Sequence, residues 1–296
     1  MSSISFEKAT VPERDLSGAE SEGALPASRS SRRRVPLTLL LAWAVIALVV
    51  LWALAPQLFT AYSETEGIAG AQRLTPGGEH WLGTDQLGRD LYARIVYGAS
   101  QTLAGAVVAV ALGLVFGTAL GLIAGALGGV ADDAVMRVVD VLLSIPGLLL
   151  SLSIIILLGF GTVNAAIAVG VTSVANFARL ARAEVVRVRH SDYVEAAYGS
   201  GGSFWAVLWR HILPNSLTSV IACSALQFGS AILAIATLSF LGYGTPPPTP
   251  EWGLLIAEGR NYISTAWWLT TFPGMVVVAV VLAANRISRS LGGKAR

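Results

Sequence analysis

Long uncharged stretches, separated by short charged ones, set the hydropathy pattern of this chain. From Leu37 to Ala55, nineteen residues carry no charge, which at about 1.5 Å per residue is enough to cross roughly 30 Å of hydrocarbon. Three longer stretches also lack charged residues: Ile95–Ala131, Val141–Ala178 and Ile212–Pro250. Because a membrane-spanning helix needs about 20 apolar residues, the pattern predicts an all-α, polytopic membrane protein.

Breaks inside these stretches predict six transmembrane helices. Gly159–Asn164 divides the second long stretch into two, and the prolines at Pro246–Pro248 end the helix of the third. The expected spans are residues 37–59, about 100–127, one on each side of 159–164, about 215–240 and about 268–285. The rest of the chain is expected to form a disordered tail at 1–36 and an outer segment with an interfacial helix at 60–99. A five-helix core is expected at 100–290, with a cytoplasmic loop at 181–214, followed by a tail at 291–296.

Small residues recur every four positions along the helix expected at 100–127. Gly113, Gly117, Gly121 and Gly125 belong to this row. They give the helix a shallow face, where a neighbouring helix can approach closely and gain dispersion contacts. The row predicts packing against other spans of this chain or of a partner chain; a direct role in substrate binding is the alternative.

A polar insert interrupts the apolar pattern between Glu195 and Asn215. It is expected to form a short helix that opens with Glu195, Ala196 and Ala197 and ends at Gly201, because glycine tolerates the backbone of a sharp turn. Pro214 is expected to lead the chain back into the membrane, since proline suits the first turn of a helix. The insert predicts a site where a partner protein acts on the chain, and an ordinary loop between helices is the alternative.

Composition and charge exclude several classes of function. The chain is 54% hydrophobic and 13% charged, with one cysteine, three histidines and no GxxxxGK[ST] motif. A disulfide framework, a metal cluster and ATP binding through a phosphate loop therefore have no residues to form them. The expected spans contain no mid-membrane charge, which argues against an ion-coupled carrier. An external ATPase is the energy source that remains.

The basic residues indicate the orientation of the chain. If the N-terminus is inside, sixteen of the twenty Lys and Arg residues lie in cytoplasmic segments. This bias follows the positive-inside rule. Both termini are therefore expected in the cytoplasm, and the polar insert lies on the side where ATP is available.

The spacing of the polar insert resembles the cytoplasmic EAA loop of ABC-importer permease subunits. The matching residues are Glu195, Ala196, Ala197, Gly201, His211, Pro214 and Asn215. In that family the loop forms a coupling helix seated in a cleft of the ATP-hydrolysing subunit, so the resemblance implies that role here. It also implies the type I ABC importer permease fold, with the basic helix end at Arg179–Arg189 carrying motion to the gate. Ser200 departs from the family, which usually has leucine there.

Two further segments resemble the C-type permease subunit of dipeptide and oligopeptide importers, a peptide/nickel-type branch. They are His80–Asp90 with its continuation to Ser100, and Leu238–Gly242 with the prolines and Trp252-Gly253 that follow. Pro246 stands where the family often has glutamine. With the loop, the resemblance covers roughly residues 35–293.

The resemblance implies a pore subunit, not an enzyme, that moves dipeptides or short oligopeptides across the bacterial cytoplasmic membrane. Its implied partners are a homologous B-type permease, one or two ATP-binding subunits, an extracytoplasmic substrate-binding protein and lipid, with no nucleic acid. No cofactor or metal is expected on this chain, and ATP and Mg belong to the partner subunits. Nickel chelates or haem as cargo, and a membrane scaffold without transport, remain alternatives.

Charged and aromatic residues mark the expected outer segment. Asp85 with Arg89 and Asp90 with Arg94 have the i, i+4 spacing of a solvated ion-pair ladder on an interfacial helix. The alternative is that Asp85, Arg89 and Asp90 contact a docked binding protein or line an outer vestibule. The tryptophans at 81, 252, 267 and 268 are expected in the aromatic belt at the membrane surface.

Overall fold

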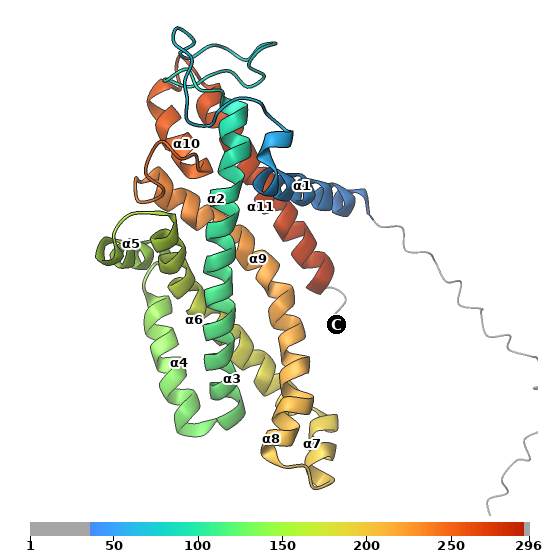
Figure 1. Cartoon of the computed structure of the whole chain (residues 1–296). Helices are drawn as coiled ribbons and strands as arrows, with labels where there is room; N and C mark the ends of the chain where they lie inside the picture. Colours follow the sequence, from blue (N-terminus) through green and yellow to red (C-terminus); the bar gives the residue numbers. More distant parts are fainter. Residues whose placement is uncertain (1–35, 293–296) are drawn as a thin grey trace, which may run out of the picture. The chain divides into compact units, whose positions relative to one another are not determined.

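The computed structural model describes residues 36–292, with side chains through residue 290, so the tails predicted at 1–36 and 291–296 fall almost entirely outside it. Within that range the chain is helical, with no strand longer than an isolated bridge between Thr84 and Asp90. The helices are α1 (Leu37–Leu54), α2 (Leu91–Leu112), α3 (Thr118–Leu127), α4 (Gly129–Ser144), α5 (Gly147–Leu158), α6 (Thr162–Arg189), α7 (Asp192–Gly199), α8 (Phe204–Val207), α9 (Leu213–Phe240), α10 (Trp252–Gly259) and α11 (Trp268–Gly292) (Figure 1). Two π-helical turns, Gly113–Gly117 and Leu208–Ile212, join α2 to α3 and α8 to α9, and two short 3-10 turns, Pro56–Leu58 and Arg260–Tyr262, follow α1 and α10.

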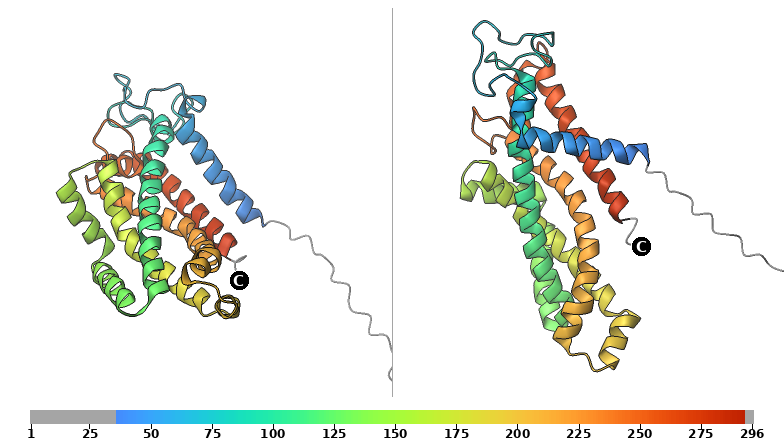
Figure 2. Two further views of the ribbon diagram at one scale, coloured as in Figure 1. Left: turned by 60° about the horizontal axis from the view of Figure 1, so that its bottom comes forward. Right: turned by 45° about the vertical axis from the view of Figure 1, so that its right-hand side comes forward.

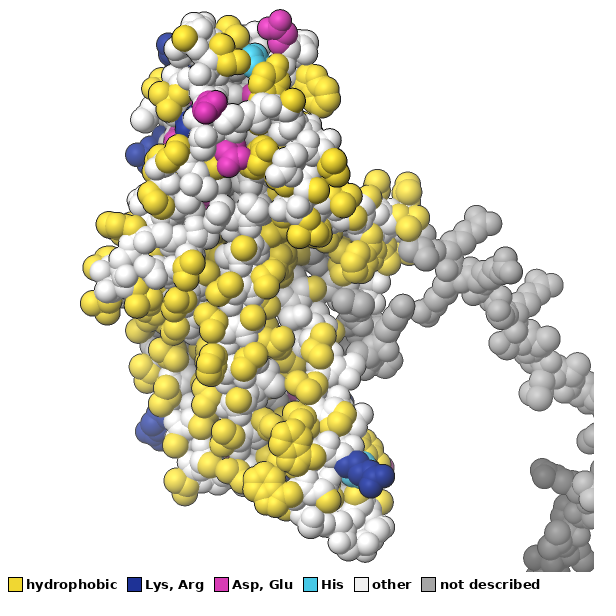
Figure 3. Space-filling view, viewed as in Figure 1, with side chains coloured by type: hydrophobic (Ala, Val, Ile, Leu, Met, Phe, Trp, Pro, Cys, Tyr) yellow, Lys and Arg dark blue, Asp and Glu magenta, His cyan; other side chains and the backbone are white. Residues whose placement is uncertain are grey.

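Between residues 36 and 292, five continuous helices are long and apolar enough to cross a membrane. They are Leu37–Leu54, Leu91–Leu127, Thr162–Arg189, Phe204–Phe240 and Trp268–Ser290. On one face, hydrophobic side chains cover the middle of these helices while charged ones gather near the two ends (Figure 3). The distribution matches the apolar interior and polar surfaces of a bilayer.

The remaining predicted span, formed by α4 and α5, differs from the prediction because it is bent. α4 and α5 meet at an angle of 93°. Pro146 forces the break: Ile145 before it is extended, as residues before proline prefer, and α5 begins directly after it. The six predicted spans are therefore present when this pair is counted as one broken span.

The predicted interfacial helix before residue 100 is also wrong as a separate element. α2 begins at Leu91 and runs without a break through the π-helical turn into α3. Asp90 caps it, since its carboxylate accepts a hydrogen bond from the Ala93 amide at 2.7 Å. The charged residues before Leu91 therefore lie in an irregular segment and not on a helix.

α6 packs against α2, α3, α5 and α9, and the two views of Figure 2 follow this helix between its neighbours. The predicted glycine row lies in this contact. A Cβ atom added at Gly113, Gly117, Gly121 or Gly125 would come closer than 3.0 Å to an atom of α6. The row thus lets α2–α3 and α6 of the same chain approach each other closely, as small residues do between membrane helices.

The α10 end of the molecule buries two of the four tryptophans that were expected at the membrane surface. Trp252 is fully buried and its indole donates to the Ile95 carbonyl at 2.9 Å, which fixes α10 to α2. Trp268 is 3% exposed and its indole donates to the Thr84 carbonyl. Trp81 and Trp267 are exposed, as the belt prediction requires. The belt assignment is therefore wrong for Trp252 and Trp268, which join helices to one another.

Candidate functional site: the coupling loop

The polar insert forms a short helix at the end of the molecule opposite to α10. α7 follows α6 after His190 and Ser191, and lies beside α8 (Figure 1). We call residues 181–214 the coupling loop, after the role that the resemblance implies. α7 begins at Asp192, three residues before the predicted opening at Glu195, so both acids lie in its first turn. Acidic side chains are favourable there because they face the positive end of the helix dipole.

Two glycines end α7 as predicted. The Gly202 amide donates to the Ala197 carbonyl at 3.0 Å, and the Gly201 amide donates to the Tyr198 carbonyl at 2.9 Å. This pair of bonds is a Schellman motif, which needs a left-handed residue between helix and loop. Gly201 takes that place with φ +86°. At Gly202 a Cβ atom would lie 2.7 Å from the Ala197 carbonyl oxygen, so the turn requires both glycines.

One side of α7 is anchored to the helices behind it. Val194 is fully buried in an apolar cluster that joins four segments of the chain. The cluster consists of Ala126 from α3, Val185 and Val188 from α6, Val194, and Val207, Leu208 and Ile212 from the α8 segment. A displacement of α7 therefore has to move these helices or disrupt their packing.

The other side of α7 is exposed among the residues that the structure describes. Asp192, Tyr193, Glu195, Ala196 and Tyr198 are exposed. This face combines two acids, two aromatic rings and a small side chain on a helix of eight residues. Such a face can enter a groove of another protein, with Ala196 allowing close approach.

The return to the span begins earlier than Pro214, which corrects the prediction. The Ser203 hydroxyl caps α8 by accepting from the Ala206 amide, and the helix then continues to Phe240. Pro214 lies inside this continuous helix, just after the π-helical turn. Proline lacks an amide hydrogen and crowds the preceding turn, so a local change of helix type is expected there. His211 lies in that turn, where its carbonyl accepts from the Asn215 side chain at 2.6 Å.

Basic side chains of α6 tie the coupling loop to α3 and α4. Arg189 donates to the carbonyls of Gly125 and Ala126 at the end of α3, where cations are favoured by the helix dipole. Arg182 pairs with Asp132 of α4 at 2.6 Å. Arg179 makes a more exposed pair with Asp140. The predicted basic helix end is thus in contact with the bent α4–α5 pair.

At the α10 end, charged residues form a buried network that keeps one of the two predicted ion pairs, Asp85 with Arg89. Arg89 pairs with Asp85 at 2.6 Å, whereas Arg94 pairs with Asp85 at 2.8 Å and with Glu258 of α10 at 2.6 Å. The side chains of Asp85, Arg89 and Arg94 are no more than 3% exposed. We call these four residues the ion network.

Asp90 is not part of that network. Its carboxylate is 2.8 Å from the ring Nδ1 of His80 and accepts from the Ala93 amide. The predicted Asp85–Arg89 pair is present, but it is buried and not solvated. The predicted Asp90–Arg94 pair is wrong, because the Asp90 carboxylate caps α2 and faces His80 while Arg94 pairs with Asp85 and Glu258. Contact of Asp85, Arg89 or Asp90 with a binding protein or a vestibule stays a prediction, and any such contact has to reach side chains that this chain buries.

Three important residues were not predicted from the sequence. Val194 lies between Tyr193 and Glu195 of α7, and no sequence pattern distinguishes it. Glu258 joins the ion network across 164 positions of sequence, which no local spacing signals. Glu251 caps α10 by accepting from the Gly253 and Leu254 amides, and burial raises the pKa of its carboxyl group above the ordinary 4.5.

Comparison with known proteins identifies the family. Residues 117–296 match the family model described as binding-protein-dependent transport system inner membrane component. A probable D,D-dipeptide transport system permease protein, DdpC, of Escherichia coli strain K12 is 38% identical over 84% of each chain. A dipeptide transport system permease protein, DppC, of Alkalihalophilus pseudofirmus is 40% identical over 83% of this chain and 81% of its own.

Similarities at lower sequence identity agree with this family assignment. A glutathione transport system permease protein, GsiD, of Pectobacterium atrosepticum is 36% identical over 73% of this chain and 72% of its own. The inward-facing structure of the MetNI methionine ABC transporter contains a chain that aligns with a TM-score of 0.52 and 19% identity, covering 68% of this chain and 97% of that one. That likeness gives the fold, which is the predicted type I permease fold. The chain belongs to the family of binding-protein-dependent transport system inner membrane components, and it is a multi-pass permease of an ABC transport system.

Proposed function

We propose that this chain is the C-type permease subunit of an importer for dipeptides or short oligopeptides, driven through α7 by a partner ATPase. The observation that carries the coupling role is the two-sided placement of α7: its exposed face is free for a partner, while Val194 on the other side is buried among α3, α6 and α8. A scaffold that does not transmit motion has no need for this arrangement.

The proposed mechanism is alternating access in a pair of permeases. A homologous B-type permease and this chain enclose a path, and one or two ATP-binding subunits hold α7 in a cleft. Closure of the ATPase on ATP and Mg moves α7 as a rigid lever, because its start continues from α6 and its end is fixed by the Schellman turn. The Arg182–Asp132 pair then passes the motion from α6 to the bent α4–α5 pair.

The proposal that the cargo is a peptide rests on the names of the relatives. Three of them, from three bacteria, are named as permeases for D,D-dipeptides, dipeptides and glutathione, all of which contain amide-linked amino acids. A substrate-binding protein on the outer side would select the peptide. The same charge bias that puts α7 in the cytoplasm would put both termini there and α10 outside.

Uptake of a labelled dipeptide tests the proposal in cells that retain the native partners. Deletion of the chain is expected to abolish uptake, and the intact chain is expected to restore it. Gly201→Pro should not restore it, because proline cannot adopt φ +86° and lacks the amide that bonds Tyr198. Glu195→Ala is expected to reduce uptake, and Glu66→Ala, an exposed acid at the other end, serves as the matched control.

Two results would count against the proposal. Full uptake with Gly201→Pro would contradict a coupling role for α7. Undiminished dipeptide uptake in the deletion strain, with other peptide systems removed, would contradict a peptide cargo and favour nickel chelates or haem.

A further inference from the structure

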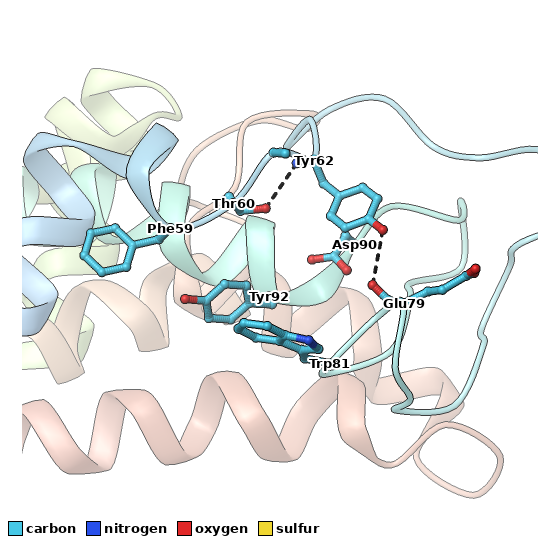
Figure 4. Close-up of a pocket in the computed structure, with 8 residues that line it drawn as sticks. Phe59, Thr60, Tyr62, Glu79, Trp81, Asp90 and Tyr92 are labelled. Carbon is cyan, nitrogen blue, oxygen red and sulfur yellow. Dashed lines mark hydrogen bonds between the residues drawn. The ribbon is translucent and has the colours of Figure 1, made fainter.

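A cavity of about 200 Å³ lies where α1 and α2 meet the irregular segment at the α10 end. It is lined by Phe59, Thr60, Ala61, Tyr62, Glu79, Trp81, Asp90 and Tyr92 (Figure 4). The volume exceeds what one water molecule needs. No residue of this cavity belongs to the coupling loop or to the ion network.

The walls of the cavity are aromatic. The ring centroids of Trp81 and Tyr92 lie 5.4 Å apart, and those of Tyr62 and His80 lie 5.0 Å apart, both pairs in tilted arrangements. Trp52 packs edge-on behind both Phe59 and Tyr92, so these walls are supported from the α1 side. The Tyr62 hydroxyl donates to the Glu79 carbonyl at 3.2 Å, which closes the rim.

The charge of the cavity is negative. The Asp90 carboxylate points into the space between Phe59, Tyr62 and Tyr92, whereas the Glu79 side chain points away (Figure 4). Asp90 already accepts from Ala93 and faces His80, but a carboxylate has about four acceptor positions. Among the described residues that line the cavity there is no Lys or Arg. Aromatic faces around one carboxylate are the arrangement that attracts an organic ammonium group.

The position of the cavity indicates where that ammonium group comes from. Phe59 lies five residues after the end of α1, whose side chains are mostly exposed, and Leu58 beside it is 81% exposed. Asp90, which caps α2, and Tyr92 in its first turn lie five and three residues before Ile95, where the uncharged span begins. Both neighbours therefore place the cavity at the level of lipid headgroups, where aromatic residues gather.

We propose that this cavity binds the ammonium group of a zwitterionic phospholipid headgroup, such as that of phosphatidylethanolamine. Asp90 accepts hydrogen bonds from the ammonium group, and the rings of Trp81 and Tyr92 hold it by cation–π attraction. An anionic headgroup without an amine is repelled by Asp90. The other source of the same chemistry is the N-terminal ammonium of a peptide on the outer side.

Lipid retention by the full chain, purified with its partner subunits, tests this proposal. The complex is incubated with equal amounts of phosphatidylethanolamine and phosphatidylglycerol of the same acyl chains, and retained lipids are counted by native mass spectrometry. The wild-type complex is expected to prefer phosphatidylethanolamine at least fivefold. Trp81→Leu should abolish that preference without unfolding the chain, because Trp81 is 67% exposed. Trp267→Leu, an exposed tryptophan outside the cavity, is the matched control and should keep it.

One further variant and a dipeptide-binding measurement distinguish a lipid ammonium group from a peptide ammonium group. Asp90→Asn keeps a capping oxygen for α2 but removes the charge, and it should also abolish the preference. If alanyl-alanine, but not its N-acetylated form, binds in a Trp81-dependent manner and the lipid does not, the cavity binds a peptide ammonium group and the lipid assignment is overturned. Equal retention of the two lipids by the wild-type complex, or an unchanged preference with Trp81→Leu, would overturn the site itself.

Discussion

The α10 end and the α7 end of this molecule are held together by different kinds of contact. At the α10 end, Asp85, Arg89, Arg94 and Glu258 form a buried ion network that joins an irregular segment to α2 and α10. At the α7 end, the ion pairs are more exposed and the buried contacts are apolar, centred on Val194. Charged groups need fixed partners when buried, whereas apolar side chains can slide and repack. The comparison indicates a rigid α10 end and a movable α7 end.

Removal of Asp85 should have the largest effect on stability. Asp85→Ala leaves Arg89 and Arg94 buried with only Glu258 as an acidic partner. Breaking a buried pair in this way typically costs about 3–5 kcal/mol. We expect a large drop in the thermal unfolding midpoint of the detergent-solubilised protein.

The matched control is an exposed ion pair at the other end. Arg179→Ala removes a pair whose side chains are 56% and 64% exposed, and such pairs contribute at most about 1 kcal/mol. Equal losses from Asp85→Ala and Arg179→Ala would remove the contrast between the two ends.

Truncation of Val194 tests the apolar end. Val194→Ala removes buried methyl groups and leaves a cavity, at a cost of about 1–3 kcal/mol. We expect fewer peptides imported per ATP hydrolysed, because α7 is less firmly attached to α3 and α6. Val130→Ala, at a valine that is 85% exposed, should change neither the stability nor the number of peptides imported per ATP. Normal import per ATP in Val194→Ala would show that the cluster does not transmit the motion of α7.

A methyl group at Gly121 tests the contact between α3 and α6. Gly121→Ala places its Cβ too close to α6, and such overpacking costs about 1–3 kcal/mol. Gly274→Ala meets no atom within 4 Å and is the control. Thermal unfolding should separate the two variants, and a stability loss of the same size in both would mean that helix propensity alone is being measured.

The effect of Glu251 should be visible as a pH dependence of stability. Its pKa in the folded protein lies above 4.5 because of burial, so the folded state holds a proton that the unfolded state releases in this interval. Stability therefore falls as the pH rises from the ordinary pKa through the raised one. Glu251→Gln keeps one of the two oxygens that accept from the Gly253 and Leu254 amides, cannot ionise, and should flatten this slope. A slope equal to that of the wild type would show that another group carries it.

Sequence patterns predicted the structure correctly where it is determined by residues close together in the sequence. Charge-free runs gave the spans, the four-residue glycine row lies in the α2–α3 contact with α6, and Gly201 with Gly202 gave the end of α7. The errors arose where tertiary contacts decide. Asp90 starts α2 because it caps the helix, and Arg94 turns toward Glu258, which is distant in sequence.

Two other errors concern proline and tryptophan. Pro146 bends a span that hydropathy alone treats as straight, and Pro214 lies inside a helix that Ser203 has already started. Trp252 is buried because its indole has a carbonyl partner on α2. Hydropathy cannot tell such a tryptophan from one at the membrane surface, because both settings suit an apolar ring with one polar atom.

Peptide import per ATP in proteoliposomes is the most direct measurement of the central claim that α7 couples ATP hydrolysis to the spans. The purified complex is compared with Gly201→Pro, which breaks the Schellman turn, and with Gly199→Ala, which adds a methyl group that meets no atom within 4 Å. The account predicts an assembled Gly201→Pro complex that hydrolyses ATP but imports at least tenfold less peptide per ATP, while Gly199→Ala behaves like the wild type. A Gly201→Pro complex with the wild-type ratio would contradict the account.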